Sequence, residues 1–131
     1  MINLGDTFLL PSPGGVPEHL WIVITERDAK HKAVCVNVTD EDKHPDKTTI
    51  LRIGEHPFIT KVSVIRYGKA AVTDLALVEG AIKNGMSGKV CAHHRRCSPE
   101  LLQRVQEGVL ISIYTPKAIK ALFRKPDEHV K

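Results

Sequence analysis

Short β-rich segments separated by turn residues fill the first half of the chain, and they constrain its fold more than any other feature. The predicted strands are residues 6–11, 19–25, 33–39, 48–53 and 62–67, with residues 70–73 as a continuation of the last or as a sixth strand. The segments between them lack the length and period of a crossover helix, so successive strands should pair antiparallel. The pattern predicts a small antiparallel SH3-like β-barrel or a strongly bent sheet.

Two of these strands differ in the burial they predict. Residues 19–25 are apolar on both faces and rich in β-branched side chains, which is typical of a strand buried on two sides. Residues 33–39 alternate three valines with Cys35 and Asn37, so this strand should bury one face only. The charged residues between the two strands indicate the tip of a hairpin.

The hydrophobic period changes to that of a helix after residue 73. Residues 75–84 have helical spacing, with Thr73 or Asp74 as the N-cap. Ser98-Pro99-Glu100 is a helix start, because it offers a capping hydroxyl, a first-turn proline and a carboxylate near the positive end of the helix dipole. A last helix is predicted from Thr115-Pro116 to about Phe123.

Two segments near these helices have no clear period. Residues 86–96 are basic and contain glycine, so they are predicted to form a loop, while residues 109–114 fit either helix or strand. Taken together, the elements predict an α+β fold with two to three C-terminal helices. Residues 1–131 should form one domain, with a β-rich barrel at 1–73, a helical part at 74–124 and a frayed tail at 125–131.

Positive charge is concentrated in the second half of the chain. Residues 1–60 contain six Lys/Arg and nine Asp/Glu, or −3, whereas residues 61–131 contain thirteen and six, or +7, which together give the net charge of +4. Basic residues gathered on one part of a fold attract polyanions. Nucleic acid is therefore the first partner to consider, and an acidic protein is the alternative.

The compartment follows from the cysteines and the absence of targeting signals. Cys35, Cys91 and Cys97 are odd in number and are not spaced as a disulfide framework. No apolar run approaches the roughly 20 residues that span a bilayer, and residues 1–6 lack the features of a secretory signal. We expect a cytoplasmic protein with reduced thiols and no membrane association.

The densest group of chemically active side chains lies between Gly54 and Tyr67. The candidate catalytic residues there are His56, Lys61, Ser63, Arg66 and Tyr67. RNA cleavage without a metal needs a proton acceptor for the 2′-hydroxyl, a proton donor for the leaving oxygen and cations for the phosphorane, and these side chains supply all three. Alternation along the strand places Lys61 and Ser63 on one face, with His56 reaching over from the preceding loop. This chemistry requires no cofactor.

A second cluster, Cys91-Ala92-His93-His94-Arg95-Arg96-Cys97, precedes the second predicted helix. The first interpretation is a nucleic-acid-binding surface formed by Lys89, His93, His94, Arg95 and Arg96. The alternative is a zinc site formed by Cys91, His93, His94 and Cys97, because thiolates and imidazoles are the usual zinc ligands. The spacing is not that of a C-x-x-C knuckle, and the adjacent arginines raise the electrostatic cost of a dication.

The N-terminal region resembles the PemK/MazF-like toxins. The similarity lies in Gly5-Asp6-Thr7-Phe8-Leu9-Leu10, a glycine-rich loop and Leu20-Trp21-Ile22-Val23-Ile24-Thr25, within about the first forty residues. It implies an SH3-like barrel, a metal-independent endoribonuclease, and a toxin-antitoxin system with a small acidic antitoxin-like partner. Of the matched positions, only Gly5 and Asp6 carry over, and both are structural. The family's loop runs into Arg-Pro before the second strand, whereas residues 14–19 contain no arginine, so its catalytic arginine has no counterpart here.

Three functional hypotheses follow from these features. The first is a metal-independent ribonuclease of toxin type. The second is a non-catalytic module that binds nucleic acid or an acidic protein, and the third is an interaction protein organised around zinc. The sequence leaves the oligomeric state open, with a homodimer among the alternatives.

Overall fold

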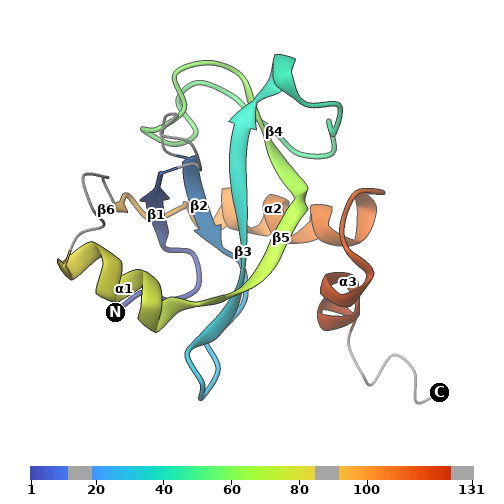
Figure 1. Ribbon diagram of the computed structural model, residues 1–131. Coiled ribbons are helices and arrows are strands. Elements are labelled where there is room, and N and C mark those ends of the chain that lie inside the picture. The colour runs from blue at the N-terminus through green and yellow to red at the C-terminus, as the bar shows by residue number, and fades with distance from the viewer. Residues whose placement is uncertain (12–18, 85–91, 125–131) are drawn as a thin grey trace.

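The computed structural model describes residues 1–11, 19–84 and 92–124, and its six strands form one antiparallel sheet in the order β4-β5-β3-β2-β1-β6. The strands are β1 (Thr7–Leu10), β2 (His19–Val23), β3 (Lys32–Asp40), β4 (Ile50–Leu51), β5 (Ser63–Asp74) and β6 (Ala92–His94). The helices are α1 (Leu75–Asn84), α2 (Pro99–Ile111) and α3 (Lys117–Phe123), with a short 3-10 turn, η2, at Glu41–Lys43. The sheet curls into a half-barrel (Figure 1). The predicted α+β fold with a bent antiparallel sheet and three helices is confirmed.

An irregularity between β3 and β5 contributes to the curl of the sheet. Cys35 pairs with Ala71 and Asn37 pairs with Arg66, so the single residue between them on β3 lies opposite four residues of β5. Extra residues on one strand bend that strand and increase its twist. Residues 70–73 are therefore a continuation of the strand predicted at 62–67, and not a sixth strand.

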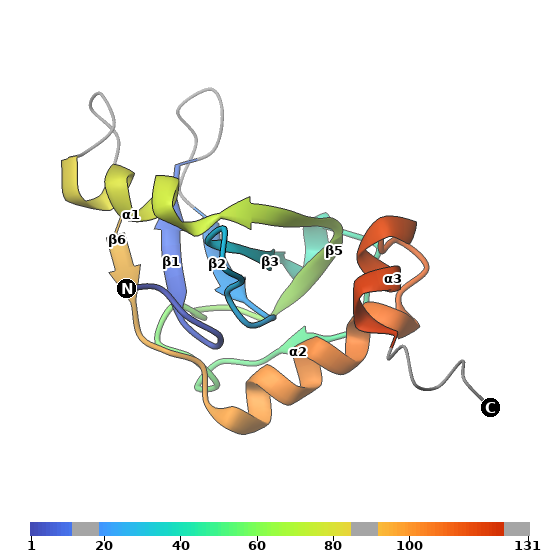
Figure 2. The same cartoon turned by 90° about the horizontal axis from the view of Figure 1, so that it is seen from below.

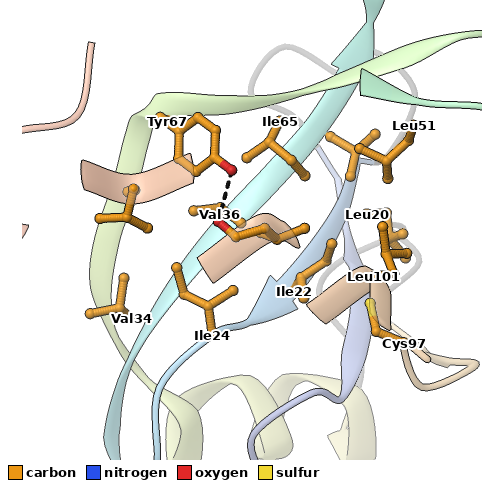
Figure 3. Close-up of a cluster of buried hydrophobic side chains, with 14 of the residues drawn as sticks. Leu20, Ile22, Ile24, Val34, Val36, Leu51, Ile65, Tyr67, Cys97 and Leu101 are labelled. Carbon is orange, nitrogen blue, oxygen red and sulfur yellow. Dashed lines mark hydrogen bonds between the residues drawn. The ribbon is translucent and has the colours of Figure 1, made fainter. Parts of the chain in front are cut away.

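The larger hydrophobic core lies between the concave face of the sheet and helices α2 and α3 (Figures 2 and 3). The sheet contributes Leu20, Ile22, Ile24, Val34, Val36, Val38, Ile65 and Tyr67, and the helices contribute Leu101, Val105, Val109 and Ile119. All of these side chains are at most 5% exposed. Burying a side chain of this size stabilises the fold by about 1.5–3 kcal/mol, so this core positions the strands whose ends form the site described below.

A second core covers the opposite face of the sheet, and it overturns one expectation. Helix α1 folds back so that Leu75 and Val78 pack with Ala33, Cys35 and other residues of that face. Strand β3 is therefore buried on both faces from residue 33 to 38, and the prediction that it buries one face only is wrong. Ala33 and Cys35 contribute small side chains to this second core.

The helix ends follow the predicted capping residues. Asp74 is the N-cap of α1, because its Oδ1 accepts hydrogen bonds from the backbone N–H groups of Ala76 and Leu77 at 3.0 and 3.3 Å. Ser98 caps α2 by accepting a hydrogen bond from the Leu101 N–H at 3.1 Å. Helix α2 continues to Ile111, so the ambiguous segment 109–114 begins as helix. None of the described helices has the length and apolarity needed to cross a membrane.

Strand β6 was not predicted. Residues 92–94 fall inside the predicted loop, yet they pair antiparallel with β1, with His94 opposite Thr7 and His93 opposite Phe8. A three-residue strand is too short to show a period in the sequence. This pairing brings His94 to the edge of the sheet, where it becomes part of the site described below.

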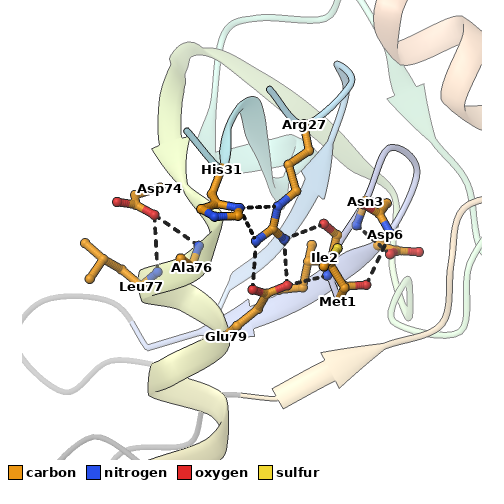
Figure 4. Close-up of polar contacts among 10 residues, drawn as sticks. All are labelled: Met1, Ile2, Asn3, Asp6, Arg27, His31, Asp74, Ala76, Leu77 and Glu79. Carbon is orange, nitrogen blue, oxygen red and sulfur yellow. Dashed lines mark hydrogen bonds and ion pairs between the residues drawn. The ribbon is translucent and has the colours of Figure 1, made fainter. Parts of the chain in front are cut away.

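A partly buried ion pair connects the N-terminus, the turn between β2 and β3, and helix α1 (Figure 4). The Arg27 guanidinium donates to both carboxylate oxygens of Glu79 at 2.6 and 3.0 Å, and the backbone N–H of Ile2 donates to the same carboxylate at 2.6 Å. The Arg27 side chain is only 9% exposed. The hydrogen bond from Arg27 lowers the pKa of Glu79 to about 2, against the opposing effect of burial.

We expect this pair to make stability depend on pH in the acid range. Because the folded-state pKa of Glu79 lies below its ordinary 4.5, the stabilisation is complete above about pH 4.5 and is lost as the pH falls toward 2. The Glu79→Gln variant should be less stable than the parent protein at neutral pH, and the difference should shrink in this window. Urea denaturation at several pH values measures it, with the exposed Glu107→Gln as the control. A difference independent of pH would contradict the assignment.

Candidate functional site

A hollow lies at one end of the half-barrel, where β2 begins, β3 ends and β6 approaches the segment before β5. We call it the strand-end hollow, and its volume is about 760 Å³. Its lining residues are His19, Val38, Thr39, Asp40, Lys43, Pro57, Phe58, Thr60, Lys61, Ser63 and His94. Imidazoles, ammonium groups, hydroxyls and an aromatic ring therefore share one surface, and pockets of roughly 300–1,000 Å³ are the usual size for small ligands.

The two lysines of the hollow are held beside carboxylates. Lys43 Nζ lies 3.4 Å from Asp40 Oδ2, and Lys61 Nζ lies 3.6 Å from Asp40 Oδ2 and 3.5 Å from Asp42 Oδ2. These pairs are exposed to solvent, and exposed ion pairs contribute at most about 1 kcal/mol. Both ammonium groups can therefore turn from the carboxylates to an incoming anion at little cost.

The two imidazoles of the hollow are held in opposite tautomers by the backbone. His19 Nδ1 lies 3.1 Å from the carbonyl oxygen of Val38, so Nδ1 carries the proton and Nε2 is left as an acceptor. His94 Nδ1 accepts a hydrogen bond from the Arg95 N–H at 2.8 Å, so its proton is on Nε2. In the neutral state, the free nitrogen of His19 can accept a hydrogen bond and that of His94 can donate one.

His56 was predicted to reach over to Lys61 and Ser63, but it does not line the hollow. It is 3% exposed, its Nε2 donates to the carbonyl oxygen of Arg95, and its Nδ1 accepts a hydrogen bond from the Phe58 N–H at 3.1 Å. Burial is the main cause that lowers its pKa, and the neighbouring charges of His94 and Arg95 act in the same direction. The His56 ring lies behind that of His94, with the centroids 5.0 Å apart. His56 therefore supports the site without facing it.

The other four predicted catalytic residues lie in three different places. Lys61 and Ser63 both line the hollow, and the Ser63 hydroxyl donates to the Lys61 carbonyl at 2.9 Å. Tyr67 is fully buried in the main core, where its hydroxyl donates to the Val105 carbonyl at 2.7 Å and burial raises its pKa. Arg66 lies on the outer face of the sheet, opposite Asn37. The five residues therefore do not converge.

The second predicted cluster is also divided by the strand. His93 and His94 are neighbours on β6, so their side chains point to opposite faces of the sheet. Arg95 and Arg96 are exposed, and Arg96 Nη1 lies 2.9 Å from Asp6 Oδ1. The predicted nucleic-acid contact Lys89 lies outside the described residues.

The described part of the alternative zinc site does not come together. Cys97 is packed in the main core at 5% exposure, and burial raises its pKa to about 11. Cys91, the remaining predicted ligand, falls outside the described residues. Within residues 1–11, 19–84 and 92–124, no group of three or more His, Cys, Asp or Glu side chains is arranged to hold a metal ion.

Several residues of the hollow were missed, His19, Thr39 and Phe58 among them. His19 lies at the start of β2 and Thr39 near the end of β3. Antiparallel pairing brings these two strand ends together at the same end of the sheet. A polar side chain at the end of a buried strand was the available signal.

Comparison of the chain with protein-family models, curated proteins and solved structures gives no match. The chemistry of the site is therefore inferred from the residues that line the hollow.

Proposed function

We propose that the protein binds single-stranded RNA in the strand-end hollow and cleaves its backbone there. The observation that carries this proposal is the pair of imidazoles, His19 and His94, which line one hollow in opposite tautomers. Cleavage by the 2′-hydroxyl needs one group that removes a proton and another that supplies one. The positive second half of the chain agrees with a polyanionic substrate.

In the proposed reaction, His19 Nε2 takes the proton of the ribose 2′-hydroxyl, and the resulting oxygen attacks the adjacent phosphorus. The bond from phosphorus to the 5′-oxygen breaks, and His94 in its imidazolium form gives its Nε2 proton to that oxygen and returns to the neutral tautomer, in which Nδ1 accepts from the Arg95 N–H. The products are a 2′,3′-cyclic phosphate and a 5′-hydroxyl end, so protons and electrons balance. Lys43 and Lys61 would stabilise the added charge on the phosphorane, and Phe58 offers a ring for base stacking.

We expect His19→Ala and His94→Ala each to reduce the cleavage of a single-stranded RNA by about a hundredfold or more. Cleavage should persist in EDTA and should show a bell-shaped dependence on pH, as for an acid and a base that act together. The matched control is His93→Ala, because His93 is the neighbour of His94 on the same strand, is exposed and does not line the hollow. Equal rates for all three variants and the parent protein would overturn this catalytic assignment.

The second candidate is RNA binding without cleavage, and the carboxylates beside the lysines favour it. Asp40 itself lines the hollow, and a carboxylate there opposes the negative charge of a phosphorane. This function predicts affinity that falls steeply with salt and RNA that stays intact in both EDTA and magnesium buffers. Cleavage products that the parent protein forms in either buffer, and that His19→Ala does not form, would contradict binding without cleavage.

A further inference from the structure

Three side chains form a row across the outer face of the sheet. Trp21 on β2 lies directly opposite Asn37 on β3, and Asn37 lies directly opposite Arg66 on β5. Residues paired in this way have neighbouring side chains on the same face. Trp21 and Arg66 are half-buried, and Asn37 between them is 4% exposed. An aromatic ring, an amide and a guanidinium therefore lie side by side.

Two polar atoms of this row have no hydrogen-bond partner among the residues that the structure describes. Asn37 Oδ1 is a buried acceptor and Arg66 Nε is a buried donor, and neither is satisfied. Buried polar atoms are almost always paired, and unpaired ones are found where a ligand completes the set. These two atoms belong to directly opposed residues and have complementary hydrogen-bonding roles.

The row lies two residues along the strands from two residues of the strand-end hollow. His19 and Thr39 line the hollow, and each lies two residues before or after a member of the row on its own strand, Trp21 and Asn37 respectively. Side chains two residues apart on a strand share a face and are separated by about 7 Å. A strand of RNA whose phosphate occupies the hollow can therefore place a neighbouring base over the row.

We propose that Trp21, Asn37 and Arg66 form a base-recognition subsite beside the hollow, an inference that rests on the proposed action on RNA. A phosphate carries only acceptors, so it would satisfy Arg66 Nε and leave Asn37 Oδ1 without a donor. The edge of a nucleobase carries a donor and an acceptor side by side and satisfies both atoms. Trp21 supplies a ring on which that base stacks.

The asparagine at position 37 also favours a ligand that carries a donor. An aspartate opposite Arg66 would give its guanidinium a charge-assisted hydrogen bond and would need no donor from outside. An asparagine leaves the amide oxygen dependent on a donor that the described residues do not provide. Asn37→Asp should therefore close the subsite by pairing it internally.

The test compares two uncleavable 2′-O-methyl oligonucleotides of equal length, one with bases and one with abasic residues. Asn37→Asp should raise the melting temperature and weaken binding of the base-containing oligonucleotide by about tenfold, with little change for the abasic one. Arg66→Gln should show the same base-selective loss, which keeps the test valid if Asn37→Asp folds poorly. Gln103→Glu adds the same charge at an exposed position of α2 and should leave both affinities unchanged.

The outcomes separate the two proposals. An equal loss for both oligonucleotides would show an effect of charge alone and would overturn the subsite, as would unchanged binding of both. Parent protein that binds the two oligonucleotides equally would also overturn the subsite while RNA binding stands. Parent protein that binds neither would overturn the proposed function itself.

Discussion

Replacing Gly108 by alanine is expected to lower the free energy of unfolding by about 3 kcal/mol or more, the upper range for overpacking a core. A Cβ at this position would lie 2.0 Å from the Tyr67 hydroxyl oxygen, 2.5 Å from Tyr67 Cζ and 2.6 Å from Thr49 Oγ1. These atoms cannot move freely, because the Tyr67 hydroxyl is hydrogen-bonded to the Val105 carbonyl oxygen and to Thr49 Oγ1, both at 2.7 Å. The methyl group would therefore displace either α2 or the tyrosine ring.

Urea denaturation of Gly108→Ala measures this loss. Gly80→Ala is the matched control, because Gly80 is also in a helix and its Cβ would meet nothing within 4 Å. That control should be neutral or more stable by up to about 1 kcal/mol, since alanine favours helix over glycine. The double variant Gly108→Ala/Tyr67→Phe should lose less free energy of unfolding than the two single variants lose together, because both changes affect the same steric conflict. A parent-like midpoint for Gly108→Ala would contradict the close contact.

Local patterns in the sequence were sufficient for most of the elements. The apolar run that starts at His19, the valine alternation of residues 33–39 and the cap at Ser98 each depend on near neighbours, and each element formed where it was expected. Burial of the second face of β3 depends on α1, whose position relative to the sheet is a tertiary property. The pattern of residues 33–39 therefore predicted the strand correctly and the burial of its second face incorrectly.

The candidate site was harder to predict, because residue type does not specify exposure. His56 and Tyr67 have the chemistry of catalytic residues, but both are sealed in packing. His19 and His94 are far apart in the chain and share the hollow only because β1 pairs with both β2 and β6. That pairing depends on a three-residue strand with no signal of its own, so a short contiguous segment was favoured over residues from separate strands.

Replacing His56 by alanine is expected to destabilise the protein by about 2 kcal/mol or more. The change would leave the Phe58 N–H without its acceptor and would remove one of two donors to the Arg95 carbonyl, the other being Thr7 Oγ1 at 2.7 Å. It would also leave a cavity behind the ring of His94. Phe58 and His94 both line the hollow, so its shape should change together with stability.

The same histidine should make stability fall as the solution becomes mildly acidic. Burial holds the folded-state pKa of His56 below its ordinary 6.5, so the unfolded chain binds the proton more readily. The contribution is complete above pH 6.5 and declines as the pH falls through that value toward the folded pKa. Denaturation of the parent protein should show this decline, and His56→Gln should not, whereas the exposed His93→Ala should behave as the parent. If His56→Ala kept full stability and lost only RNA cleavage, His56 would be a catalytic group after all, and His94 would not be the proton donor proposed here.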